Sequence, residues 1–345
     1  MRSQGSLIGK NNDPATGQGI WDLNSINKLG SRRNAGKLGT QRNTPAFKEA
    51  QGIWSLEEAM SYVLSSNWST SAFNSTTCDF AVIAGGGGAA GQRAGGGGAG
   101  GMLVNTDETI SVGDVLTATI GAGGSSSNGS DSSMVGGSVS ITSTGGGDAG
   151  IAGSDGGSFG SMAGGNGGSG GGASTRSVSQ STAGTGVSGQ GHNGAEESNS
   201  GIVVGSNYAF YGGGGGGKSS AGSGRNGGAG LEYPTGSGSY YAGGGAAGKA
   251  NGPTVGCNES GTIGTGGTGG GGDGDGSAGA TNTGGGGGGN GCSTGGAGGS
   301  GIVIMKILSS AYSGNTTGSP TVTDFSDSSG DYKLVKFTGS GTYTV

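Results

Sequence analysis

Residues 79–88 read Asp79-Phe-Ala-Val-Ile-Ala-Gly-Gly-Gly-Gly88, a run of strand-forming residues that passes directly into polyglycine. The chain of 345 residues holds 95 glycines; 8 precede Ala84 and 5 follow Gly301, so 82 lie in the region between. Glycine loses more backbone freedom on folding than any other residue, and it has no side chain to bury. The region is therefore either disordered or held together by its backbone.

The spacing of the glycines favours an ordered backbone lattice. Several tracts carry glycine at every third position, as in Gly164, Gly167 and Gly170. Three residues make one turn of a polyproline II helix, which leaves every N–H and C=O free to bond to neighbouring chains. Charges are too few to keep the region expanded, and the near absence of proline excludes a collagen triple helix. Disorder, the ordinary interpretation of a Gly- and Ser-rich composition, is the alternative.

Strand patterns surround the tracts. Val115, Thr117 and Thr119 alternate with apolar neighbours, which is typical of a half-buried strand, and a Gly113-Asp114 turn precedes them. Similar strand patterns occur at residues 79–84, 101–104, 138–144, 302–306 and 332–345. The predicted fold is mainly β plus polyglycine II helices: a glycine-rich lattice with short antiparallel strands and little α-helix. One short helix near the N-terminus is expected from Ser55 to about residue 66.

Composition divides the chain into four segments: 1–78, 79–150, 151–301 and 302–345. We expect an attachment segment, a strand/glycine domain, a polyglycine II lattice with loops, and C-terminal strands that close the domain. The first segment holds two Gly-Ile-Trp-x-Leu units, which place Trp21 with Leu23 and Trp54 with Leu56. It also carries 8 of the 16 Lys and Arg residues, without the interleaved aromatics of a base-stacking surface. Docking on an acidic protein is therefore favoured over nucleic acid.

The strand–glycine junctions also carry a family resemblance. The stretch from Phe80 through Gly121-Ala-Gly-Gly124 resembles the glycine-rich domain of bacteriophage tail fibres and other virion proteins. Two further stretches, Gly299-Ser-Gly-Ile-Val-Ile-Met-Lys306 and Phe337-Thr-Gly-Ser-Gly-Thr-Tyr-Thr-Val345, are similar to the way such domains close. The resemblance covers residues 79–345. It implies a virion protein, and within this class some adhesins carry receptor-binding loops on a polyglycine II lattice.

Aromatic residues gather in one part of the lattice region. This group consists of Tyr208, Phe210, Tyr211, Tyr233, Tyr240 and Tyr241. One interpretation is an exposed platform for sugars, since tyrosine offers an apolar face and a polar tip. The other is a small satellite core between the lattice and a loop. The sequence leaves both open.

No constellation of catalytic residues is recognisable, so we expect no enzyme and no cofactor. Residues 212–219 match the phosphate-loop pattern, but the following Ser-Ala-Gly-Ser-Gly cannot propagate the helix that this motif requires. His192 has no second histidine or nearby cysteine to share a metal ion. Asp273 and Asp275 supply two carboxylates, too few for a calcium site by themselves. No metal site is therefore predicted.

The predicted function is host-surface recognition by a bacteriophage virion surface protein, a tail fibre or receptor-binding adhesin. Its expected partners are other virion proteins, through the N-terminal segment, and a host surface glycan or protein. A homo-oligomer is expected, with a trimer as the guess by analogy. No signal-peptide pattern and no apolar run of membrane-spanning length occurs, so synthesis in the host cytoplasm and a place on the virion surface, without membrane insertion, are expected. The alternatives are a capsid-decorating or tail-structural protein without a receptor, and a non-viral glycine-rich extracellular or ice-binding protein.

Overall fold

The computed structural model describes residues 75–89, 91, 94–151, 162–174, 181–196, 203–204, 207–251, 263–291 and 293–345. The chain divides into two units, Met1–Ser75 and Thr76–Val345, and all of the described residues except Ser75 belong to the second. The helix expected from Ser55 and the units with Trp21, Leu23, Trp54 and Leu56 lie outside the described residues. Within the described part of the chain, no helix is long and apolar enough to span a membrane.

The second unit is mainly antiparallel β, as predicted, and its described residues contain one 3-10 turn (Ser309–Ala311) and no α-helix. The strands are β1 (Ser75–Ile83), β2 (Met102–Ser111), β3 (Val115–Thr119), β4 (Ser132–Gly136), β5 (Val139–Ser143), β6 (Val203–Val204), β7 (Asn207–Tyr211), β8 (Leu231–Glu232), β9 (Tyr240–Tyr241), β10 (Lys249–Asn251), β11 (Ile302–Leu308), β12 (Asn315–Thr316), β13 (Thr321–Asp327), β14 (Gly330–Phe337) and β15 (Gly341–Thr344).

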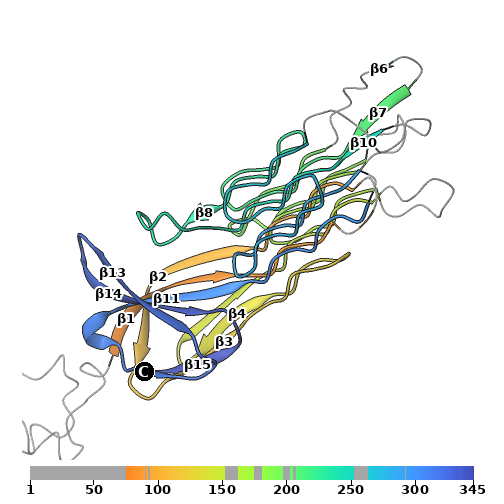
Figure 1. Ribbon diagram of the computed structural model, residues 1–345. Helices are drawn as coiled ribbons and strands as arrows, with labels where there is room; N and C mark the ends of the chain where they lie inside the picture. Colours follow the sequence, from red (N-terminus) through yellow and green to blue (C-terminus); the bar gives the residue numbers. More distant parts are fainter. Residues whose placement is uncertain are drawn as a thin grey trace, which may run out of the picture. The chain divides into compact units, whose positions relative to one another are not determined.

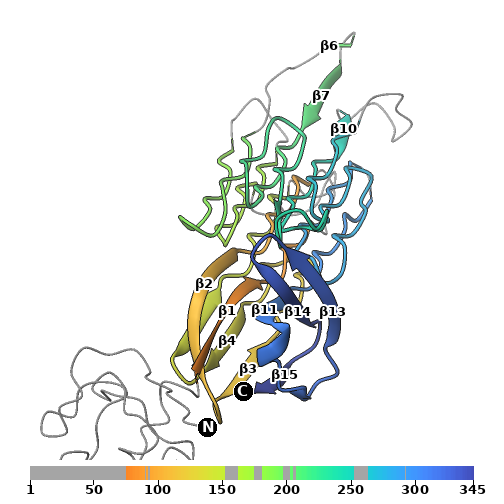
Figure 2. The same cartoon turned by 90° about the vertical axis from the view of Figure 1, so that its left-hand side faces the viewer.

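Two five-stranded sheets combine strands from both ends of the unit. Their strand orders are β13-β14-β11-β1-β2 and β12-β15-β3-β4-β5. β1 pairs antiparallel with β11, which places Phe80 opposite Met305, and β15 pairs with β3, which places Tyr343 opposite Leu116. The two sheets lie together at one end of the unit, and the glycine tracts extend away from them (Figures 1 and 2). Segments 79–150 and 302–345 thus build one set of sheets.

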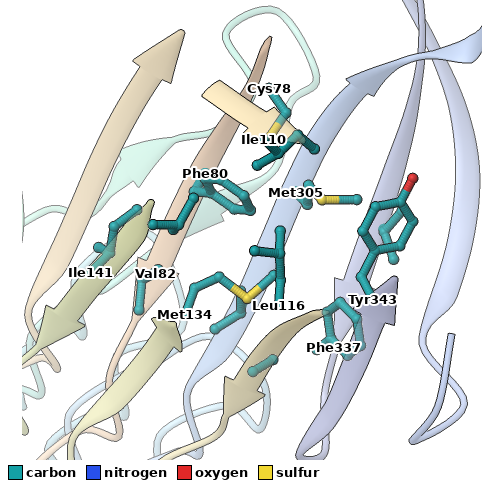
Figure 3. Packing of buried hydrophobic residues seen from close by; sticks show 14 of the residues in the cluster. Cys78, Phe80, Val82, Ile110, Leu116, Met134, Ile141, Met305, Phe337 and Tyr343 are labelled. Atoms are coloured by element: carbon teal, nitrogen blue, oxygen red, sulfur yellow. The ribbon is translucent and has the colours of Figure 1, made fainter. Parts of the chain in front are cut away.

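The main hydrophobic core lies between these two sheets. Phe80, Met305 and Phe337 come from one sheet and face Leu116 and Met134 of the other (Figure 3). The alternation predicted for residues 115–119 is confirmed, because Leu116 and Ala118 are fully buried while Val115, Thr117 and Thr119 are exposed. The core fixes which face of each strand turns inward, since a slip of one residue would expose every apolar side chain.

The central strands β1 and β11 are buried on both faces. Ala81 and Ile83 of β1 and Ile302 and Ile304 of β11 point away from the sandwich and join a second core. A strand buried on both faces reads as a continuous apolar run. Burial on both faces explains why the residues of β1 before polyglycine and of β11 after it are continuously apolar.

The predicted Gly113-Asp114 turn is present, but the strands that it joins do not pair with each other as in a hairpin. Gly113 adopts the left-handed φ of +93°, as a tight turn requires. However, β2 before it and β3 after it belong to different sheets. The chain therefore crosses from one sheet to the other at this turn.

The glycine tracts lie outside the sheets and bond to one another through their backbones. In residues 84–89, successive N–H groups donate to three neighbouring segments in rotation, at 2.8–3.1 Å. The donors and the segments that accept from them are Ala84 and Gly87 to 98–101, Gly85 and Gly88 to 127–130, and Gly86 and Ala89 to 296–299. Three other segments, at residues 124, 146–149 and 287, donate to the carbonyls of this tract. Residues three apart in the tract therefore donate their N–H groups to the same neighbouring segment.

Residues 95–101 follow the same rule with other neighbours. Their N–H groups donate in turn to segments 144–150, 213–216 and 284–287. A strand would alternate between two directions, whereas a helix of three residues per turn bonds in three. The hydrogen bonds thus agree with the polyglycine II lattice expected from the spacing. Crowding is severe, because a Cβ built on Gly97 would lie 2.8 Å from the carbonyl carbon of Gly87 and closer still to its oxygen.

Candidate functional site

A two-stranded hairpin carries three of the six aromatic candidates. β8 pairs with β9, which places Leu231 opposite Tyr241 and Glu232 opposite Tyr240. Tyr233 and Tyr241 are 8% and 7% exposed, whereas Tyr240 is 43% exposed. Because adjacent residues of a strand point to opposite faces, Tyr241 is buried while Tyr240 faces solvent.

The two buried tyrosines belong to the second core. They pack in the cluster that contains Ala81 and Ile83 from the outer face of β1. Burial raises the pKa of Tyr233, and the negative charge of Asp79 adds to this effect. The Tyr233 hydroxyl has no hydrogen-bond partner among the described residues. Burial also raises the pKa of Tyr241, while a side-chain hydrogen bond with Ser239 opposes the rise. These two rings attach the hairpin to the sheet and do not form part of an exposed platform.

The other three aromatic candidates, Tyr208, Phe210 and Tyr211, lie in β7. This strand pairs with β6 on one side and with β10 on the other, in a three-stranded sheet. The side chains of these residues lie outside the described set. β7 and β10 lie at the end of the lattice that is distant from the sandwich (Figures 1 and 2). The structure therefore does not bring β7 and the β8–β9 hairpin into one sheet.

A surface pocket of about 390 Å³ opens beside the lattice at Lys218. Its lining residues come from the turn at 186–193 and from Lys218 and Ala221. The Lys218 ammonium donates to the carbonyl oxygen of Gly189 at 2.6 Å. Burial lowers the pKa of this half-buried amine. No sequence pattern predicted this pocket, although Lys218 stands out as a lysine in a region with very few charges.

Lys218 does not belong to a phosphate loop. From Gly213 to Lys218, each backbone N–H donates to a carbonyl oxygen. Gly217 donates to Ser220 in the turn that follows, and the others donate to more distant residues of the lattice. No helix follows: residues 218–220 form bends, and an isolated bridge between Ser223 and Asn226 encloses a turn. A phosphate loop needs free N–H groups at a helix N-terminus. The match at residues 212–219 is therefore a consequence of composition.

The other polar residues singled out in the sequence stabilise turns. Asp273 accepts a hydrogen bond from the Gly266 N–H at 2.8 Å, and Asp275 accepts one from the Ser277 N–H at 2.9 Å. Among the described residues, no group of three or more His, Cys, Asp or Glu side chains is arranged to hold a metal ion. The His192 Nδ1 atom lies 3.3 Å from the Gly217 carbonyl oxygen, at the edge of the Lys218 pocket.

One protein family matches the chain, and the matched residues include the whole lattice. Residues 63–308 match the family described as a glycine-rich domain. The chain belongs to this family. The glycine-rich domain includes strands β1 to β11 and all of the lattice, so β12 to β15 lie beyond the matched residues. No curated protein and no solved structure matched the sequence.

Proposed function

We propose that this glycine-rich domain protein is a virion surface protein of a bacteriophage that recognises the host cell surface. The observation that carries the proposal is the lattice itself. Its tracts bond to each other in three directions, and bulky side chains occur at its margins. Recognition residues are commonly held on loops of a rigid scaffold. The resemblance of the junction and closing sequences to phage tail-fibre domains supports the viral context.

In this proposal, segment 1–78 attaches the protein to other virion proteins, with Trp21, Leu23, Trp54 and Leu56 as anchors. The described unit presents the recognition surface. Tyr240 is the exposed aromatic residue of the β8–β9 hairpin, and the strand with Tyr208, Phe210 and Tyr211 supplies further candidates. Closed rotational symmetry is common in homo-oligomers, so we propose a homo-oligomer, with a trimer as the first state to test. Binding, and not catalysis, is the proposed activity.

One observation favours the alternative of a capsid-decorating or tail-structural role. Tyr233 and Tyr241 are buried, so a part of the tyrosine group stabilises the fold. If the remaining aromatic residues also served only the fold, the protein would need no receptor. Cell binding separates the two functions.

The test uses the purified, labelled full-length chain on cells of candidate hosts. Saturable binding that falls at least about ten-fold for Tyr240→Ala and Tyr211→Ala supports the receptor-binding function, because aromatic contacts dominate many interfaces. The matched control is Val112→Ala, which removes an exposed apolar side chain (64% exposed) from the sheet end. Absence of binding to every host tested, with the chain folded, supports the structural role instead.

A further inference from the structure

The pocket at Lys218 is held in shape by the backbone of its rim. The Val187 carbonyl oxygen accepts hydrogen bonds from the N–H groups of Gln190 and Gly191, which closes a turn. Gln190 then accepts a hydrogen bond from the Thr144 N–H through its Oε1 atom at 2.7 Å, at the end of β5. The rim is therefore fixed to the sandwich before any ligand arrives.

Among the described residues that line the pocket, Lys218 is the one lysine, arginine, aspartate or glutamate. Its amine donates one hydrogen bond, to Gly189, and an ammonium group has three N–H donors. It makes no ion pair within the described part of the chain. A half-buried cation without a counter-charge favours an anionic ligand, since burying an unpaired charge is costly.

Neighbouring side chains offer both donors and acceptors. Asn193 accepts from the Gly186 N–H through Oδ1, which leaves its amide N–H groups for a ligand. The Nδ1 atom of His192 lies 3.3 Å from the Gly217 carbonyl oxygen, which only accepts hydrogen bonds. This contact is a hydrogen bond in the tautomer with hydrogen on Nδ1, and in that tautomer Nε2 is an acceptor. A ligand with hydroxyl groups can use both residues.

We propose that this pocket binds an acidic sugar unit, with its carboxylate on Lys218 and its hydroxyl groups on Asn193 and His192. The volume of about 390 Å³ falls within the roughly 300–1,000 Å³ of small-molecule sites. The inference rests on the proposed function, because it names the class of host glycan that the surface recognises. It adds the pocket to the proposed recognition surface: the Lys218 N–H donates to the Ala242 carbonyl oxygen, next to Tyr241 of the β8–β9 hairpin.

The test measures direct binding of methyl glucuronide, methyl glucoside and inorganic phosphate to the full-length chain by ligand-observed NMR. A dissociation constant on the order of 1 mM is expected for the glucuronide, as for a ligand of this size. Lys218→Met should weaken glucuronide binding about ten-fold or more, because a hydrogen bond to a charged group is lost. The control Lys333→Met removes a half-buried lysine on β14 that pairs with Asp324, and it should leave binding unchanged.

Three outcomes overturn the inference. They are equal binding of glucoside and glucuronide, binding of phosphate without the sugar acid, and glucuronide binding that survives Lys218→Met. Equal melting temperatures of the variants and the parent chain exclude misfolding as the cause of any loss. If glucuronide fails to bind while the chain still attaches to host cells, this inference fails and the proposed function stands.

Discussion

Substitution of one glycine inside the lattice tests whether the tracts are packed as the structure has them. Gly97 donates its N–H to the Gly287 carbonyl oxygen at 2.8 Å and accepts from the Gly245 N–H at 2.9 Å. A Cβ at position 97 would lie 2.8 Å from the Gly87 carbonyl carbon and 3.1 Å from the Gly287 nitrogen. Cβ atoms in proteins essentially never approach other heavy atoms to less than 3.0 Å. The neighbouring tract must therefore move.

The cost of this movement follows from the hydrogen bonds at the contact. The Gly87 carbonyl oxygen, which the new methyl group would strike, accepts from the Gly287 N–H at 3.0 Å. If two such buried bonds are lost, at about 1–3 kcal/mol each, the free energy of unfolding falls by roughly 2–6 kcal/mol. The lower entropy of the unfolded alanine chain offsets only about 0.4–1 kcal/mol of this loss. Gly97→Ala should therefore destabilise the unit by about 2–5 kcal/mol.

The matched control is Gly339→Ala. Gly339 has no atom within 4 Å of an added Cβ, and its φ lies outside the left-handed region. This variant should be neutral or more stable by up to about 1 kcal/mol. Urea unfolding followed by circular dichroism gives the stabilities, and hydrogen exchange read by mass spectrometry shows whether protection of residues 95–101 is lost. If Gly97→Ala is as stable and as protected as Gly339→Ala, the lattice is wrong and the disordered alternative gains support.

Three further predictions concern the two hydrophobic cores. Burial, reinforced by the negative charge of Asp79, raises the pKa of the Cys78 thiol from 9.0 to about 12. As the pH rises, the unfolded chain loses this proton first, so the contribution of the thiol to stability is full below pH 9 and falls above it by about 1.4 kcal/mol per pH unit. The measurement is urea unfolding of the parent chain and of Cys78→Ala at pH 8 and pH 10, and the difference between the two proteins should change by this amount. Tyr233→Phe removes a buried hydroxyl without a partner among the described residues, so it should raise the free energy of unfolding by about 1 kcal/mol. Tyr241→Phe removes a hydroxyl that is hydrogen-bonded to Ser239, so it should lower the free energy of unfolding by about 1 kcal/mol. If urea unfolding shows Tyr233→Phe to be the less stable of the two variants, the placement of the two rings is contradicted. Phe80→Ala empties the centre of the sandwich and should cost about 3–5 kcal/mol in urea unfolding, and a loss below about 1 kcal/mol would mean that Phe80 is not buried.

The strands that the sequence predicted are those with a clear burial pattern. β3 alternates between buried and exposed residues, and the second half of β1, Phe80–Ile83, is a continuous apolar run, so both patterns are local. β13 was not predicted, because six of its seven residues are exposed and it has no alternation. β4 begins with Ser132 and Ser133, which resemble a loop in sequence, although Ser132 is fully buried and accepts the Gly121 N–H. Its strand form depends on neighbours distant in the chain, which no local pattern records.

The partners of each glycine tract were beyond prediction for a different physical reason. Gly97 lies beside Gly287 and Gly245, which are far from it in sequence. In a sheet, a buried face fixes the register, because a slip exposes apolar side chains. Glycines carry no side chains, so one tract offers the same surface as another. The non-glycine residues where the tracts join the sheets, such as Ala84 and Met102, are buried, and their side chains help to fix the register that glycine alone leaves open.

The same reasoning limits where this unit can recognise anything. From Gly213 to Lys218, and again in residues 95–101, the N–H groups are already bonded within the lattice. A ligand would therefore have to displace lattice bonds to use them, and the cost of leaving buried backbone groups unpaired opposes this. Under the proposed function, recognition therefore uses side chains at the margins of the lattice. Tyr240 is exposed on its hairpin and Lys218 is half-buried in its open pocket, so their substitutions test binding without removing the backbone bonds of the lattice.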